Sequence, residues 1–315
     1  MPDKQLELFP NAGLQGLNLP QGPDLRPTDS LGKTMEPFTE YMQQKGFAEN
    51  TIASFLGHMG LLIKFLGPET ALDKCSTQQL ERFLDFIRTG RGVPCSPKSL
   101  DRRITTLKVF FGWLAEKSVL PNDPAAPLVH YGARSPLPTI LVEEQIREVL
   151  RVTKAMRDAE EAPDARPHLL ITLLLATAIK KAECMRIELH HIDLSDAAQP
   201  SVYIHYDKPR QRFKTRRLAL PADWPQTLEV YLRRYQPKER LFECTPRNLE
   251  YVLHNISTLA YLANPMTFEM LRWTSATQSL REGMDEERLR KRLGLSRIAW
   301  QETLPILQKL AEGPL

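Results

Sequence analysis

The sequence predicts a mainly helical protein of two domains that carries one small β-hairpin. Three observations support this fold class. Apolar residues recur at three- and four-residue spacings through most of the chain after residue 34. A proline-rich stretch at 119–138 separates an N-terminal group of helical segments from a C-terminal group. Two short runs within 201–221 are typical of strands, and a turn joins them.

Length and composition exclude several classes of protein. The chain has 315 residues, which is enough for two domains at roughly 100–200 residues each. Hydrophobic residues make up 42% and charged residues 25%, as in an ordinary globular protein and unlike a disordered one. No apolar window is long enough for a membrane span, and the first residues lack the pattern of a secretory signal. The four cysteines are scattered, so we expect a reducing, cytoplasmic location.

The N-terminal part is expected to form a tail and a helical bundle. Residues 1–33 hold five prolines and four glycines without a periodic apolar face, which predicts a flexible tail. Ser76 and Ser96 are suitable N-caps for the last two helices of the bundle. The bundle is expected over 34–130, and a linker over 131–140 follows it. The expected helices are 35–47, 51–67, 76–90 and 96–117.

The C-terminal domain, expected over 141–315, combines helices with the hairpin. A helix is expected near 142–157, and the strongly apolar segment 168–187 is typical of a buried helix. The two strands lie within 201–221, with Pro209 in the turn between them. The remaining helices are expected over 225–235, 245–263, 266–283, 285–295 and 300–312.

A run of cations marks the predicted hairpin as a candidate contact with nucleic acid. The run comprises Lys208, Arg210, Arg212, Lys214, Arg216 and Arg217. Such a hairpin can lie along a phosphate backbone, where each cation displaces a condensed counterion. A charged edge strand that resists pairing with another sheet explains the same charges equally well. The overall net charge of +4 permits nucleic-acid binding without requiring it.

The fourth predicted helix carries a further candidate contact. Its cations are Lys98, Arg102 and Arg103, although an ordinary exposed helix face is the stronger explanation. The chain contains no glycine-rich phosphate loop of the nucleotide-binding types. His190 and His191 are adjacent near an expected strand, where neighbouring side chains point to opposite faces. We therefore expect no metal, no cofactor and no small-molecule substrate.

Six segments, taken in order, resemble one known family. They are F-T-E-Y-M-Q-Q-K-G-F-A-E-N-T-I at 38–52, the segment 96–128 that ends in N-D-P-A-A-P-L, T-A-I-K-K-A-E-C-M-R-I-E-L-H-H-I-D at 177–193, Y-D-K-P-R-Q-R-F-K-T-R-R at 206–217, M-T-F-E-M-L-R-W-T-S-A-T at 266–277 and L-R-K-R-L-G-L at 289–295. Together they resemble the tyrosine recombinases of the phage integrase and Xer type. The resemblance implies a helical core-binding domain, followed by a catalytic-type domain of helices and a small sheet.

The resemblance also implies a chemistry. The family cleaves DNA by attack of a tyrosine on the scissile phosphate, while two arginines and a lysine balance the phosphate charge. The first arginine position is Lys180 here, which keeps the charge but loses the bidentate fork. The second arginine is kept as Arg272. The lysine of the hairpin corresponds to Lys208 or Lys214, because the loop length leaves the match open.

The remaining catalytic positions depart further from the family pattern. Glu269 replaces the first histidine and brings a negative charge to a phosphate site, while the assisting position is Trp273, which some members use. Leu295 replaces the histidine of the L-G-H phrase. The nucleophile is expected near Leu304, and the last tyrosine of the sequence, Tyr261, precedes the conserved arginine. We therefore expect no intact catalytic set.

Three functions are compatible with these residues. The favoured one is a DNA-binding protein on a recombinase scaffold, associated with the nucleoid, that does not cleave DNA. Lys180 and Arg272 would then join the hairpin cations in contacting duplex phosphates. An active recombinase that uses Ser296, Thr303 or a partner's tyrosine is the first alternative, and a helical interaction module that has lost DNA binding is the second. Residues 299–312 could dock on another copy or on an active recombinase, or could pack in cis.

Overall fold

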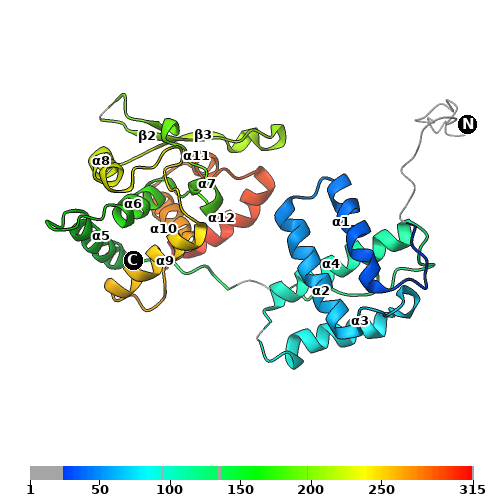
Figure 1. The fold of residues 1–315 in the computed structure, drawn as a ribbon. Helices are drawn as coiled ribbons and strands as arrows, with labels where there is room; N and C mark the ends of the chain where they lie inside the picture. The colour runs from blue at the N-terminus through cyan, green and yellow to red at the C-terminus, as the bar shows by residue number, and fades with distance from the viewer. Residues whose placement is uncertain (1–23, 94, 133–135, 197, 314–315) are drawn as a thin grey trace, which may run out of the picture. The chain divides into compact units, whose positions relative to one another are not determined.

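The chain folds into two units, which divide between residues 135 and 136. The computed structural model describes residues 24–93, 95–132, 136–196 and 198–313. Helices predominate in both units, and the one sheet of these described residues lies in the second unit (Figure 1). The predicted class, mainly helical with a small hairpin, is confirmed. None of the helices in the described ranges combines the length and apolar character that crossing a membrane requires.

The first unit is a bundle of helices around an apolar core. Ser76 and Ser96 each accept a hydrogen bond from the backbone N–H three residues on, so the predicted N-caps are present. The rings of Phe38 and Phe110 meet edge to face at 5.0 Å between centroids, and both are fully buried. The helices of this unit are η1 Leu31–Thr34, α1 Met35–Gln44, α2 Glu49–Leu66, η2 Leu72–Lys74, α3 Thr77–Asp85, η3 Phe86–Gly90 and α4 Pro97–Glu116.

The predicted tail over 1–33 extends too far into the folded unit. Residues 1–23 lie outside the described part of the chain, but Leu31 is fully buried in the core of the bundle. Its neighbour Ser30 pairs with Ala71 in an isolated antiparallel bridge. A single apolar residue among prolines and glycines has no periodicity, and for this reason the sequence pattern missed the contact.

The second unit packs its helices around α6, which contacts α5, α8 and α10. Most of α6 is buried, as expected of a segment that is apolar on all sides. The helices of this unit are α5 Glu143–Arg157, α6 Arg166–Thr177, α7 Lys181–Cys184, η4 Leu189–His191, η5 Pro209–Lys214, α8 Trp224–Tyr235, α9 Pro246–Leu259, α10 Phe268–Arg281, α11 Glu286–Arg292 and α12 Arg297–Ala311.

One predicted helix is broken in two. Ala178 adopts a left-handed conformation, with φ of 52°, and ends α6, so the single helix predicted over 168–187 is wrong. The break could not be predicted from the residue type, because alanine favours helices and seldom adopts positive φ. The break turns the carbonyl of Ala178 toward Arg272 of α10, which donates a hydrogen bond to it.

The sheet is antiparallel, with strands in the order β1 Ile192–Asp193, β2 Ser201–Ile204 and β3 Arg216–Ala219. Strands β2 and β3 form the predicted hairpin, with Ser201 opposite Ala219 and Ile204 opposite Arg216. Both strands are shorter than predicted, since η5 occupies the connection. Pro209 opens η5, where its fixed φ suits a helical turn and its missing N–H cannot join a ladder.

The last helix packs within its own chain. Helix α12 lies against α10, and Leu307 is fully buried between them. Arg281 of α10 donates hydrogen bonds to the carbonyls of Leu310 and Ala311 at the end of α12. Of the two arrangements considered for 299–312, the structure has packing in cis.

Candidate functional site

A cavity of about 740 Å³ in the second unit collects most of the catalytic-type positions. Lys208, Lys214 and Leu304 are not among the residues that line it. Its walls come from the break between α6 and α7, the start of α10 and the segment that joins α11 to α12. The sequence-predicted residues that line it are Lys180, Glu269, Arg272, Trp273 and Leu295.

Arg272 is a buried cation that is held by backbone carbonyls. Its guanidinium donates to the carbonyl oxygens of Ala178 and Leu293, the second at 2.7 Å. Burial lowers the pKa of Arg272 to about 10, although the nearby carboxylate of Glu183 acts in the opposite direction. The side chain therefore stays charged at neutral pH, and no carboxylate of the described residues forms an ion pair with it. A cation of this kind beside a cavity favours an anionic ligand.

Lys180 brings a second positive charge to the cavity. The side chain is half-buried, and burial together with the charge of Arg272 lowers the pKa of its ammonium. Within the described ranges this ammonium has no hydrogen bond or ion pair. Its neighbour Lys181 differs, because its ammonium lies 2.7 Å from a carboxylate oxygen of Glu250. Lys180 is thus the lysine of this pair that is available to a ligand.

A buried ion pair supports the cavity. Nη1 and Nη2 of Arg216 each lie 3.0 Å from a carboxylate oxygen of Glu183. The side chains of Arg216 and Glu183 are only 8% and 1% exposed. Tyr206 and the backbone N–H of Lys180 also donate to this carboxylate, each at 2.8 Å. Burial favours the neutral carboxyl, but the hydrogen bonds and charge of Arg216 outweigh it and lower the pKa of Glu183 to about 2. Arg216 is therefore not the phosphate contact that the sequence predicted.

Comparison with known proteins shows a similarity to phage integrases and tyrosine recombinases. Residues 35–118 match the family described as the phage integrase N-terminal SAM-like domain. The chain is 26% identical over 284 residues to tyrosine recombinase XerC of Anoxybacillus flavithermus, which spans 84% of this chain and 90% of that protein. It is 23% identical over 282 residues to XerC of Bacillus subtilis, covering 83% and 88%. Over most of its length, the chain is thus similar to tyrosine recombinases of the XerC type.

Solved structures of an integrase and a recombinase share the fold of this chain. A lambda integrase dimer bound to a COC′ core site aligns with a TM-score of 0.68 at 13% identity, over 91% of this chain and 79% of that one. The XerH recombinase bound to palindromic difH substrate aligns with a TM-score of 0.67 at 17% identity, over 89% and 82%. The two-domain architecture that the resemblance implied is confirmed.

The cations of the hairpin in this tyrosine recombinase fold are not equivalent. Lys208, Arg210 and Arg212 are exposed, and in the described structure they form no ion pair. Arg217 is also exposed, but it pairs with Asp193 of β1. The hairpin thus offers three exposed cations that no carboxylate neutralises.

Lys214 is the hairpin lysine whose charge acts on a residue of the cavity. Its ammonium lies 5.5 Å from the ring centroid of Tyr206, the residue that donates to Glu183. Its charge also helps to lower the pKa of Lys180, after burial and the charge of Arg272. This effect favours Lys214 over Lys208 as the lysine that acts on the cavity.

On α4, two of the three candidate cations are free to contact a ligand. Lys98 and Arg102 are exposed. Arg103 instead donates to the carbonyl of Ser99 at 2.9 Å and to the sulfur of Cys95 at 3.3 Å. One nitrogen of its guanidinium is engaged within the unit, so Arg103 is less available to a phosphate than Lys98 and Arg102.

No candidate nucleophile among the described residues stands beside a base. Leu304 is partly buried against an apolar cluster that includes Trp300. The hydroxyl of Ser296 caps α12 by accepting a hydrogen bond from the N–H of Ala299. Thr303 lines the cavity, but its hydroxyl donates to the carbonyl of Ala299 at 2.7 Å. None of these contacts activates a hydroxyl for attack.

Glu269 has a local role at the start of α10. Thr267 caps this helix by accepting from the N–H of Met270, and Glu269 lies exposed in the first turn. An acidic side chain there interacts favourably with the positive end of the helix dipole. Glu269 also lines the cavity that contains Arg272, and so brings a negative charge to it.

Sequence reasoning did not single out Arg292 as a functional residue. The guanidinium donates to the carbonyl of Ala176 at 2.7 Å and to the hydroxyl of Ser275 at 2.9 Å, and it thereby ties α11 to α6 and α10. Burial lowers the pKa of Arg292. Its neighbours Arg290 and Lys291 do pair with Glu287 on the surface, so the sequence gave no signal that Arg292 differs.

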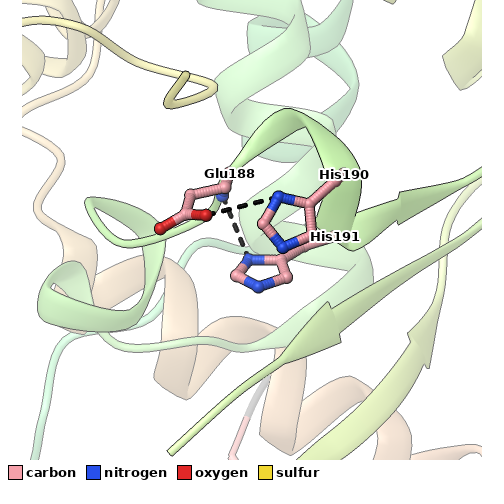
Figure 2. Close-up of side chains that lie close together, drawn as sticks. All are labelled: Glu188, His190 and His191. Atoms are coloured by element: carbon pink, nitrogen blue, oxygen red, sulfur yellow. Dashed lines mark hydrogen bonds and ion pairs between the residues drawn. The ribbon is translucent and has the colours of Figure 1, made fainter.

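The expectation for His190 and His191 was also wrong. They lie on η4 and not on a strand, and their ring centroids are only 4.3 Å apart (Figure 2). Both rings face Glu188, which precedes η4. The argument that strand neighbours point to opposite faces therefore does not apply to this pair.

Proposed function

We propose that this chain binds double-stranded DNA through its recombinase scaffold and does not cleave it. One observation carries the proposal. The cavity holds two cations, Lys180 and Arg272, with which no carboxylate of the described residues forms an ion pair, while Leu304 occupies the sequence position at which the family's nucleophile is expected. The site is thus suited to hold a phosphate and not to attack it.

We infer that the ligand is duplex DNA, both from the free cations and from the solved structures of related proteins. The related solved structures include a lambda integrase bound to a core site and XerH bound to difH substrate. The exposed hairpin cations Lys208, Arg210 and Arg212 suit a phosphate backbone, and Lys214 is our choice for the family's hairpin lysine. Backbone contacts of this kind fix the position of the protein on DNA but carry no direct sequence information. We expect such a protein to be associated with the nucleoid.

Several substitutions act together against cleavage. Lys180 lacks the planar fork that grips two phosphate oxygens, and Glu269 adds negative charge near the phosphate. Leu295 can donate no hydrogen bond. Loss of a single donor to a transition state costs about 3–4 kcal/mol in known enzymes. Restoring one residue therefore leaves the barrier too high for a measurable rate.

A pair of adjacent lysines gives the test of binding. Fluorescence anisotropy with a labelled duplex of random sequence should show binding that weakens steeply as salt increases. Lys180→Gln removes the free ammonium and should lower the affinity by about tenfold, equivalent to about 1.4 kcal/mol. Lys181→Gln removes an ammonium that Glu250 already neutralises, so it should change the affinity much less.

Two results would contradict the proposal. The first is absence of binding at low salt, which would favour the interaction module that has lost DNA binding. The second is an equal effect of the two lysine substitutions, which would show that the cavity does not contribute to the contact.

A further inference from the structure

A second group of polar side chains lies on the turn that leads into β1 (Figure 2). Glu188, His190 and His191 each offer one ligand atom, and these atoms all lie within 4.8 Å of one another. Nδ1 of His190 is 3.3 Å from Oε2 of Glu188. None of the three residues lines the cavity described above, so this cluster is a site separate from that cavity.

The spacing of these atoms suits a transition metal. Bonds of about 2.0–2.1 Å place two ligands of a tetrahedral zinc ion about 3.3–3.4 Å apart. The separation of the His190 nitrogen and the Glu188 oxygen already has this value. Nδ1 of His191 accepts a hydrogen bond from the backbone N–H of Glu188 at 3.1 Å, so its lone pair points into the same turn. A metal ion bound at these atoms would replace this hydrogen bond and the direct contact between His190 and Glu188.

We propose that Glu188, His190 and His191 form a binding site for a late first-row divalent metal ion, zinc above all. Two imidazole nitrogens and one carboxylate oxygen suit Zn²⁺, Cu²⁺ and Ni²⁺, whereas Mg²⁺ and Ca²⁺ prefer oxygen ligands alone. A neighbouring cavity of about 490 Å³ is lined by both histidines and gives water access to the remaining coordination positions. Three protein ligands and an open position are typical of an accessible zinc site.

The position of the turn indicates what the metal does. The backbone of Glu188 forms an isolated bridge with Arg240, and η4 leads directly into β1. Asp193 of β1 in turn pairs with Arg217 of the hairpin. A bound ion therefore fixes the conformation of the turn that leads into β1, and it acts on the hairpin only through β1.

Copper spectroscopy on the full chain tests the ligand set. One equivalent of Cu²⁺ should give an electron paramagnetic resonance spectrum with two coupled imidazole nitrogens. His190→Ala and His191→Ala should each show one nitrogen and should weaken zinc binding, measured by competition with a chromophoric chelator, by at least about tenfold. His190 is 72% exposed, so its substitution leaves the fold intact.

His205 provides the matched control. It lines the same neighbouring cavity, but its Nε2 lies 2.8 Å from Asp207, and it is not part of the proposed set. His205→Ala should therefore keep both coupled nitrogens and the zinc affinity of the parent chain. An equal loss in His205→Ala would overturn the assigned ligands. Absence of zinc binding in the parent chain, or zinc affinity that is unchanged in both His190→Ala and His191→Ala, would overturn the site.

Discussion

Arg216 donates to both carboxylate oxygens of Glu183, with 3.0 Å between each donor and its acceptor. The contact joins β3 to α7. The same carboxylate accepts a hydrogen bond from the backbone N–H of Lys180, and so it also fixes the position of Lys180. Gly294 lies directly beside this arginine, because a Cβ on that glycine would stand 2.7 Å from Nη1 of Arg216. The ion pair therefore supports the cavity, but neither of its two charges is available to a ligand.

Breaking this ion pair should destabilise the protein strongly. Glu183→Ala leaves the buried guanidinium of Arg216 without its counter-ion, and loss of one partner of a buried pair costs about 3–5 kcal/mol. Urea unfolding followed by circular dichroism measures the change. Arg210→Ala, which removes an exposed arginine of the same hairpin, should leave the urea midpoint unchanged.

The same pair makes stability depend on pH in a defined direction. The folded pKa of Glu183, about 2, lies below its ordinary value of 4.5, so the unfolded state binds the proton first as pH falls. The contribution of Glu183 is therefore complete above about pH 5 and is lost as pH falls from about 4.5 to about 2. Urea midpoints across this range should fall more steeply for the parent chain than for Glu183→Gln. Parallel curves would contradict the assignment.

Gly294→Ala should be far more damaging than Gly283→Ala. Both glycines have positive φ, of 60° and 81°, so both substitutions incur the backbone strain of about 1–2 kcal/mol. Only the new methyl group at residue 294 meets Arg216, whereas a Cβ at Gly283 has no neighbour within 4 Å. Thermal unfolding of the two variants measures the difference, and equal losses would show that Arg216 moves aside without cost.

The exposed hairpin cations should determine the salt dependence of DNA binding. Replacing Lys208, Arg210 and Arg212 by Ala should reduce the slope of log K against log salt by about 0.9 per lost phosphate contact. The affinity should fall evenly across DNA sequences, since these contacts read the backbone. As a control of similar charge, Arg147→Ala with Lys154→Ala on α5 should leave the slope unchanged. A slope unaffected by the hairpin substitutions would place the DNA elsewhere.

Most of the fold could be predicted from the sequence, because helical periodicity is a local signal. The N-caps Ser76 and Ser96 were recognisable from their residue type and position, and the hairpin from its two short strands. The break at Ala178 was not recognisable, because the left-handed turn there is held by tertiary contacts such as the bond from Arg272.

The site was harder to predict than the fold. Family phrases indicated which positions face the cavity, and Lys180, Glu269 and Arg272 do line it. They could not show that Arg216 and Arg292 are buried, since a charged residue in a basic run looks like every other one until its partner is known. Those partners, Glu183 and the carbonyl of Ala176, are distant in sequence.

Restoring the catalytic positions tests how far the old geometry survives. Leu304→Tyr alone should form no covalent complex with DNA, because Glu269 still repels the phosphate and Lys180 still lacks the fork. A quadruple variant restores all four positions and tests whether the catalytic geometry is retained. Its substitutions are Lys180→Arg, Glu269→His, Leu295→His and Leu304→Tyr. Denaturing gels with nicked duplex measure the adduct, and an adduct in Leu304→Tyr alone would show that the remaining site is better preserved than we infer.

The most direct test of the central claim combines binding and cleavage in one sample. The parent chain is incubated with a nicked suicide duplex at a protein concentration where anisotropy shows the duplex to be saturated. Half of the sample is then denatured and examined for protein linked covalently to DNA. We predict a saturated duplex and no covalent adduct. An adduct that resists denaturation would contradict the claim that the chain holds DNA without cleaving it, and so would a failure to bind the duplex.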